Sequence, residues 1–279
     1  MAMSVTVFAI VLFAAALHAS WNAVVKSGSD KLLTAVLVTT SAAIFAAIAL
    51  PLLQQPNSAS WPFICASAIL QVIYFLLLAR TYHIADMSQT YPVMRGTAPL
   101  LVAIVSAYVL GAHMSPKIWL GIGIICLGIL GMTAGVRHGA GKGITLALLN
   151  AVVIAAYTLV DGLGVRRSGA PAAYTLWIFL ATGIPLAAWA LTRRRASLAS
   201  YARQNWHFGL VGAVGTVASY GLALWAMTVA PIAVVAALRE TSILFGAIIS
   251  GLLLKERIGF TRFTAACAIA LGAAVLRLA

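Results

Sequence analysis

The sequence has few charged side chains of either sign, and acidic ones are the scarcest. Only 8% of its 279 residues are charged, 63% are hydrophobic, and just 5 are Asp or Glu. A soluble domain of this size carries about 25% charged residues. Because there is too little polar material to cover a water-facing surface, the composition excludes an ordinary soluble protein and predicts an all-α integral membrane protein.

The sequence also lacks the patterns that mark catalytic and metal-binding sites. It has no HExxH, no Gly-x-Ser-x-Gly and no Walker loop, and the glycines around Lys142 do not have phosphate-loop spacing. The cysteines Cys65, Cys126 and Cys267 lie in separate apolar segments without a CxxC spacing, which indicates neither a zinc site nor a disulfide framework. We therefore expect no enzymatic activity, no cofactor and no bound metal.

Basic residues outnumber acidic ones by 18 to 5, which gives a formal net charge of +13. In a soluble protein this excess would suggest a nucleic-acid partner. Here the basic residues lie almost entirely between apolar runs, where they orient a membrane protein, and no basic stripe carries aromatics at stacking spacing. We expect the lipid bilayer and a small molecule as partners, and no nucleic acid.

Ten apolar segments are long enough to cross a bilayer as helices, which takes about 20 residues each. The connections carry turn or charge signals, and none is long enough for a separate extramembrane domain. The first segment lacks a basic stretch before it and is longer than a signal-peptide core, so we expect it to span the membrane. The ten segments are 4–24, 32–53, 61–80, 87–110, 116–136, 143–163, 172–191, 206–228, 232–254 and 260–278.

The basic residues of the connections are divided unequally between the two sides. Twelve follow odd-numbered segments, four lie on the opposite side, and Arg95 and Arg239 lie inside segments. The positive-inside rule then places the odd connections in the cytoplasm. With ten crossings, both termini are predicted to be external, in a multi-pass protein of a bacterial-type inner (cytoplasmic) membrane.

The chain repeats itself at an offset of 144 residues. This offset pairs Arg95 with Arg239, each followed two positions later by Thr, inside an apolar segment. The halves 1–139 and 140–279 then hold five helices each, and because five is odd the second half enters the membrane from the opposite side. The sequence predicts ten transmembrane helices as two inverted five-helix repeats, an arrangement of secondary transporters that bind substrate near the midplane.

Three tracts carry a family resemblance: Leu17-His-Ala-Ser-Trp-Asn-Ala-Val-Val-Lys26, Gly251-Leu-Leu-Leu-Lys-Glu-Arg257, and the glycine-rich last segment. With the ten-helix layout, they resemble the drug/metabolite transporter superfamily in its EamA-type branch, over nearly the whole chain. The resemblance implies a solute carrier, often an exporter of amino acids or other small metabolites, that works without ATP hydrolysis. The chain departs from the family at Gly111-Ala-His113, so the acidic Glu256 has no symmetric partner.

Arg95 and Arg239 are the first candidates for a substrate site. Each lies four residues from the midpoint of its segment, which is about 6 Å from the midplane at about 1.5 Å per residue. A charge at this depth marks a binding site, a pathway or a specific partner, and a guanidinium suits a carboxylate or phosphonate. The alternative is a structural ion pair of Glu240 with either arginine. We expect Arg239 and Glu240 to compensate each other and Arg95 to contact substrate.

The two copies of the arginine segment differ in their prolines. Pro92 and Pro99 flank Arg95 and predict a kink there, because proline removes an amide donor and clashes with the preceding turn. The second copy has Ala236 and Ile243 at the matching positions. We therefore expect the kink in the first copy alone.

Polar and aromatic residues complete the candidate site. His18, Trp21 and Asn22 share one helix face, for substrate or proton binding or, alternatively, for hydrogen bonds between helices and interfacial anchoring. Asp161 is expected to extend toward its helix end or to pair with Arg166, with proton coupling as the alternative. The aromatic candidates for the cavity walls, with packing as the alternative, are Tyr74, Tyr82, Tyr91, Tyr157, Trp225 and, outside the leading set, Tyr220.

Together these features predict a secondary carrier that moves a small metabolite, an amino acid or similar zwitterion, by alternating access. The alternative substrate is a more anionic metabolite, such as a phosphonate or an organic acid, because two intramembrane arginines face one nearby glutamate. A channel or a membrane-embedded enzyme ranks lower, since no acid, base and nucleophile are grouped in the sequence.

Overall fold

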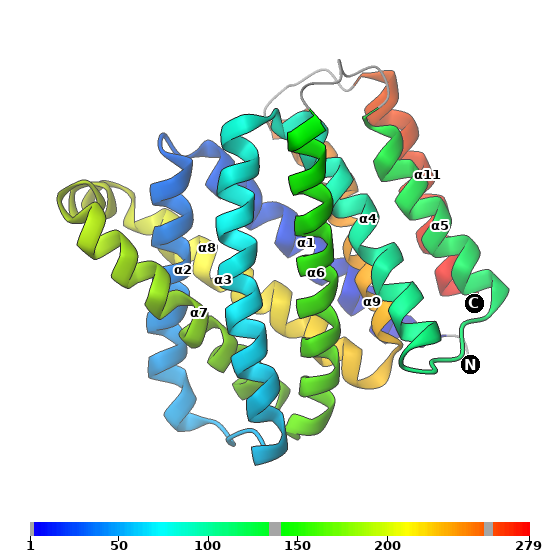
Figure 1. The fold of residues 1–279 in the computed structure, drawn as a ribbon, viewed down its shortest axis with the longest axis horizontal. Helices are drawn as coiled ribbons and strands as arrows, with labels where there is room; N and C mark the ends of the chain where they lie inside the picture. Colours follow the sequence, from blue (N-terminus) through cyan, green and yellow to red (C-terminus); the bar gives the residue numbers. More distant parts are fainter. Residues whose placement is uncertain (1–2, 134–140, 254–258) are drawn as a thin grey trace.

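The computed structural model describes residues 3–133, 141–253 and 259–279, and in these ranges all regular structure is helical (Figure 1). Two short 3₁₀ helices, η1 and η2, lie between α2 and α3 at Leu50–Leu52 and Ser58–Ser60. The α-helices are α1 Val5–Ser27, α2 Lys31–Ala49, α3 Trp61–Ile84, α4 Met87–Tyr108, α5 Pro116–Gly131, α6 Gly141–Ser168, α7 Pro171–Arg193, α8 Arg195–Val229, α9 Ile232–Arg239, α10 Ser242–Leu253 and α11 Phe260–Arg277.

The described helices account for all ten of the predicted membrane-spanning segments. Eight segments are long and apolar enough to cross a membrane, and one of these eight combines α9 with most of α10. The ninth is the shorter apolar helix α5, and the tenth is α4, which carries Arg95. The predicted all-α membrane fold is confirmed.

Local sequence explains where many helices begin and turn. The Asp30 carboxylate accepts the backbone N–H groups of the first turn of α2 at 2.9 and 3.0 Å, and Ser115 caps α5 in the same way. Pro171 opens α7, where its missing N–H costs no hydrogen bond. Between α6 and α7, Gly169 adopts φ +66°, a left-handed conformation suited to glycine.

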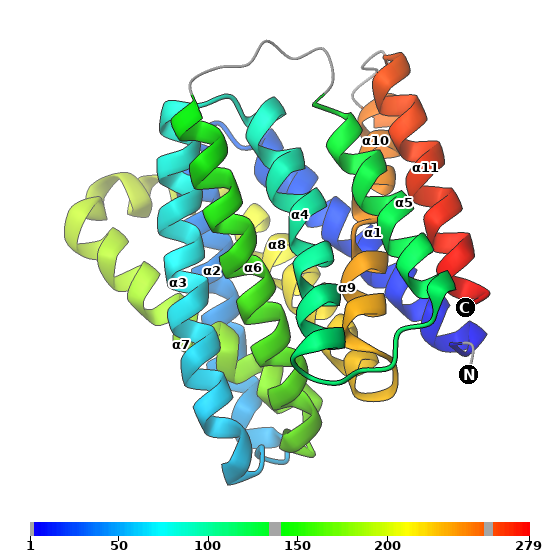
Figure 2. The same cartoon turned by 45° about the vertical axis from the view of Figure 1, so that its right-hand side comes forward.

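The two halves pack as inverted repeats around a pseudo-two-fold axis. Three elements contact their own counterparts, α5 with α11, α2 with α7 and α4 with α9, while α1 packs along α8 as its counterpart α6 packs along α3. Figures 1 and 2 show both termini at the same end of the bundle, as ten crossings require. We call this the termini end; it holds the connections 50–60, 109–115, 169–170 and 230–231. The opposite, odd-loop end holds 28–30 and 85–86.

The α5–α11 contact repeats the symmetry at the level of single glycines. A Cβ atom at Gly272 would lie 2.8 Å from the carbonyl oxygen of Gly121, and one at Gly128 would lie 3.4 Å from that of Ala265. The offset of 144 converts the second pair into the first. Small residues let the two backbones approach here, as at many transmembrane helix contacts.

The second copy of the arginine segment is interrupted, although a kink was predicted in the first copy alone. Helix α4 runs through Pro92 and Pro99 as one helix, whereas α9 ends at Arg239 and α10 begins two residues after Glu240. At the break, the Glu240 N–H bonds to the carbonyl three residues back at 3.0 Å, and the Thr241 hydroxyl donates to the Leu238 carbonyl at 2.7 Å. Tightened bonds and a competing hydroxyl explain why the helix breaks without a proline.

One predicted connection is also helical. The stretch 192–205 separates two predicted segments, but residues 195–205 of it form the start of α8, and the helix bends at Asn205 with φ −123° and ψ 21°. Leu198 and Tyr201 lie one turn apart and pack against α2, where the Tyr201 and Thr34 hydroxyls are 2.6 Å apart. The cluster of arginines around this stretch masked its amphipathic pattern.

Candidate functional site

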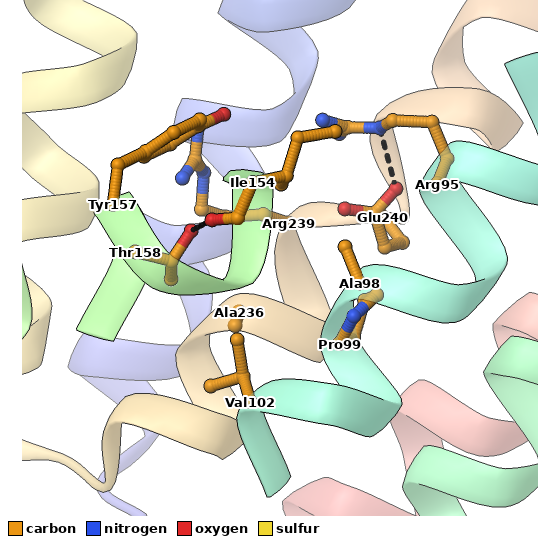
Figure 3. A pocket seen from close by; sticks show the side chains of 10 residues that line it. All are labelled: Arg95, Ala98, Pro99, Val102, Ile154, Tyr157, Thr158, Ala236, Arg239 and Glu240. Atoms are coloured by element: carbon orange, nitrogen blue, oxygen red, sulfur yellow. Dashed lines mark hydrogen bonds and ion pairs between the residues drawn. The ribbon is translucent and has the colours of Figure 1, made fainter. Parts of the chain in front are cut away.

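A small cavity lies between α4, α6 and the α9–α10 break (Figure 3). Its free volume of about 10 Å³ has room for roughly one water molecule. Both repeat-related arginines line it, one from each half of the chain. The lining residues are Arg95, Ala98, Pro99, Val102, Ile154, Tyr157, Thr158, Ala236, Arg239 and Glu240.

Arg95 and Glu240 form an ion pair across the two repeats. The Arg95 Nε and Glu240 Oε2 atoms are 2.9 Å apart, and the side chains are 12% and 6% exposed (Figure 3). At this distance and burial the opposite charges attract each other strongly. The expected pairing of Arg239 with Glu240 is wrong, and the alternative pairing across helices is the one found.

Arg239 lies instead on an aromatic face. Its guanidinium carbon is 5.0 Å from the centre of the Tyr220 ring of α8, within the range of a cation–π interaction. Among the described residues Arg239 makes no ion pair. The charged residues of the cavity lining are therefore two arginines and one glutamate, which gives the lining a net charge of +1. The arginine without an acidic partner is Arg239, not Arg95.

Four tyrosines surround Arg95 from three helices. Tyr74 and Tyr157 meet edge to face with ring centres 5.9 Å apart, and together with Tyr82 they pack against a buried α4–α6 cluster. All three, and Tyr91 on α4 itself, lie within electrostatic reach of Arg95. The structure thus brings these predicted wall residues together, and Tyr157 lines the cavity directly.

The three α1 candidates interact mainly with one another. The Trp21 Nε1–H donates to His18 Nδ1 at 3.3 Å, and the Asn22 amide donates to the His18 carbonyl at 2.7 Å. Trp21 also packs against the α8 backbone at Gly215. His18 is the one within electrostatic reach of both Arg95 and Arg239, so α1 brings His18 to the edge of the site.

The last predicted aromatic residue lies apart from the cavity. Trp225 on α8 is 36% exposed and is not a lining residue. Five residues earlier on the same helix, and so on a different face, Tyr220 is 9% exposed and lies under the Arg239 guanidinium. On α8 it is therefore Tyr220, on the inward face of the helix, that contacts a residue of the cavity lining.

Asp161 neither extends toward the helix end nor pairs with Arg166, which corrects the leading expectation. Its side chain is fully buried, and it accepts hydrogen bonds from the hydroxyls of Tyr174, at 3.3 Å, and Tyr220. Arg166 donates instead to the carbonyls of Met227 and Ala230 at 2.7 and 2.8 Å. Helix α6 continues about two turns beyond Asp161, so the carboxylate is too deep to reach its end.

Thr158 and Tyr174 are polar residues in or near the site that were not predicted from sequence. Thr158 lines the cavity, but its hydroxyl bonds to the Ile154 carbonyl of its own helix at 2.7 Å. Tyr174 reaches Asp161 across the α6–α7 turn, a contact that no spacing in the sequence indicates. No group of three or more His, Cys, Asp or Glu in the described ranges could hold a metal ion.

Comparison with known proteins gives a family match and a structural match. The model of the EamA-like transporter family matches residues 5–134 and 141–278. Among 29 matching chains of solved structures, one described as "Crystal structure of protein" is 19% identical, with a TM-score of 0.71 over 97% of this chain and 94% of that chain. At this identity the likeness shows the fold alone. No curated protein matched.

Proposed function

This chain belongs to the EamA-like transporter family, as the sequence tracts implied, and from that premise we propose that it is a secondary carrier working by alternating access. The proposed substrate is a small metabolite with a carboxylate, an amino acid or similar zwitterion. The proposed site is the central cavity, in a cytoplasmic membrane whose cytoplasmic side is the odd-loop end. The family and the membrane-spanning fold support a transporter of small molecules.

The observation that carries the substrate class is the unequal use of the two arginines. Arg95 is occupied by Glu240, while Arg239 rests on the Tyr220 ring without an acidic partner among the described residues. A guanidinium that stacks on an aromatic ring contacts it with its flat face. Its N–H groups point outward in the guanidinium plane and stay available for a carboxylate. Glu240 lines the same cavity, so its carboxylate, which pairs with Arg95 in this structure, also lies beside the place where Arg239 would hold a substrate. A substrate ammonium group could then share this carboxylate with Arg95, which favours a zwitterion.

The unequal packing of the two repeats supports alternating access. At the termini end α6 packs against α8, and Arg166 bonds to carbonyls at the end of α8. The counterparts α1 and α3 have no comparable contact in the described ranges. Inverted repeats that differ in this way exchange their conformations when the carrier switches. With room for about one water molecule, the cavity must widen to admit substrate.

One observation favours the alternative of a more anionic substrate. The charged lining sums to +1, from two arginines and one glutamate. An organic acid or phosphonate would neutralise this charge, whereas a zwitterion brings no net charge. Because a buried net charge is costly in a membrane, this alternative has its own physical basis.

Counterflow in proteoliposomes tests the proposal. Purified protein would be reconstituted with an unlabelled mixture of the standard L-amino acids inside, and uptake of the labelled mixture would be measured. We expect saturable uptake driven by the internal pool, lost in Arg239→Gln and retained in Arg203→Gln, whose side chain is exposed on α8. Uptake by Arg239→Gln at the wild-type rate would overturn the binding role. Non-saturating flux would indicate a channel.

Competition separates the two substrate classes. An excess of unlabelled glycine, a small zwitterion, would be compared with an excess of methylphosphonate. Inhibition by zwitterions alone supports the amino-acid proposal. Inhibition by the phosphonate alone would replace it with the anionic alternative.

A further inference from the structure

Asp161 lies at a second polar centre, separate from the lining of the central cavity. Its carboxylate is fully buried and accepts hydrogen bonds from Tyr174 of α7 and Tyr220 of α8. Ser67 of α3, itself fully buried, places a third hydroxyl close enough to this carboxylate to interact with it. Because the Gln71 amide donates to the Ser67 oxygen at 3.1 Å, the Ser67 hydroxyl hydrogen is free to point at Asp161. Four helices therefore meet at one acid.

The groups that bond to Asp161 are hydroxyls rather than cations. No ion pair to Asp161 occurs among the described residues, and Arg166 is engaged by the backbone of α8. The titratable and charged neighbours are Tyr157 on α6 itself, the two bonded tyrosines, and Arg239 from α9. A buried carboxylate at membrane depth without a cationic partner is costly unless it can be neutralised, and a proton neutralises it at the smallest volume.

Tyr220 connects this acid to the proposed substrate site. Its hydroxyl donates to Asp161, and its ring lies under the Arg239 guanidinium at 5.0 Å. The side chain is 9% exposed, so it has little freedom to change one contact without the other. A change at either end is therefore transmitted through one rigid ring.

We propose that Asp161 is the binding site of a proton that this carrier moves together with its substrate, and that Tyr220 couples the proton to Arg239. This inference rests on the carrier function proposed above. A proton from the accessible aqueous side adds to a carboxylate oxygen, and the resulting neutral acid donates a hydrogen bond to the Tyr220 oxygen instead of accepting one. After the carrier switches, the same proton is released to water on the other side.

The coupling favours binding of proton and substrate in the same state. The positive charge of Arg239 partly offsets the negative charge of Asp161. A substrate carboxylate bound to Arg239 neutralises that positive charge and also repels the Asp161 carboxylate. A proton on Asp161 removes that repulsion. Because linkage is reciprocal, the substrate promotes proton binding as much as the proton promotes substrate binding.

Proteoliposomes with a pH-sensitive dye inside test the proposal. The probe is the external addition of the standard L-amino-acid mixture, and the readouts are label uptake and internal acidification. In wild type we expect both. In Asp161→Asn, which keeps the volume of a protonated acid, we expect counterflow to continue while acidification falls to the level of protein-free vesicles. Asp86→Asn is the matched control, because Asp86 is exposed at the start of α4, and should acidify like wild type.

Each outcome decides between the two proposals. If Asp161→Asn vesicles acidify as strongly as wild-type vesicles, the proton site is wrong. The proton site is also wrong if the wild-type protein takes up amino acids without acidification, and in that case the carrier function still stands. Alkalinisation would overturn the shared direction of movement. Absence of saturable counterflow in wild type would overturn the carrier function itself. Should Asp161→Asn fail to fold, Tyr220→Phe keeps the acid and the ring, and we expect fewer protons per substrate than in wild type.

Discussion

Replacing the members of the Arg95–Glu240 pair by methionine provides the sharpest test of how this cavity is held together. The two side chains are 12% and 6% exposed, with Nε and Oε2 2.9 Å apart. Removing one partner of a buried ion pair costs about 3–5 kcal/mol, because it leaves an uncompensated buried charge, whereas replacing both by apolar residues is often nearly neutral. The structure further predicts that the two single replacements are unequal.

The inequality follows from Arg239. In Arg95→Met the remaining Glu240 still lies in the same lining as Arg239, which can take over as its counter-ion and lower the cost to about 1–2 kcal/mol. In Glu240→Met two arginines remain without an acid in the cavity, so we expect the full cost of about 3–5 kcal/mol. The double variant should return close to wild type.

Thermal unfolding of purified protein in lipid nanodiscs measures this order. With a sensitivity of about 2–4 °C per kcal/mol, Glu240→Met should lower the melting temperature by about 6–20 °C and Arg95→Met by about 2–8 °C. Arg203→Met removes an exposed charge and serves as the control. If Arg95→Met is as destabilising as Glu240→Met, or if the double variant is no more stable than the worse single, the pairing inferred here is wrong.

Three further predictions concern packing, closure and the outer surface. In Gly272→Ala the new methyl group would lie 2.6 Å from a side chain and 2.8 Å from a carbonyl of α5, so the melting temperature should fall, while Gly123→Ala, with open space around it, should not change it. Arg166→Gln loses two bonds to the end of α8 and should lower the melting temperature more than Arg167→Gln, which loses one bond within its own helix and an exposed contact with the Phe63 ring. Trp225→Ala, at a side chain that is 36% exposed, should leave the counterflow KM unchanged.

The sequence was sufficient for the features that depend on hydropathy and repetition. Ten crossings follow from segment length and composition, and the convergence of Arg95 and Arg239 follows from their equivalent positions in two inverted halves. The identity of each partner did not follow. Glu240 is adjacent to Arg239 in sequence, yet neighbouring residues on a helix point in different directions and do not face each other. Its carboxylate therefore reaches Arg95 on another helix.

Contacts that depend on tertiary packing were the least predictable. Asp161 and Tyr220 are 59 positions apart, and only the packing of α6 against α8 brings them together. Arg166 is nearer to Asp161 along the chain but is directed to backbone carbonyls that the end of α8 leaves unsatisfied. Matching acidic with basic side chains in the sequence does not show that backbone carbonyls can bind the arginine instead.

The unbalanced positive charge of the cavity is built into the packing of the first repeat. With the offset of 144 that relates the repeats, Gly96 is the equivalent of Glu240 in the first half of the chain. A Cβ atom at Gly96 would lie 2.8 Å from the Leu130 side chain and 3.2 Å from the Cys126 carbonyl oxygen, so α4 has no room for an acid there. With a single glutamate for two arginines, one guanidinium is left without an acidic partner among the residues that line the cavity. The proposed substrate would supply an anionic group as the partner of this guanidinium.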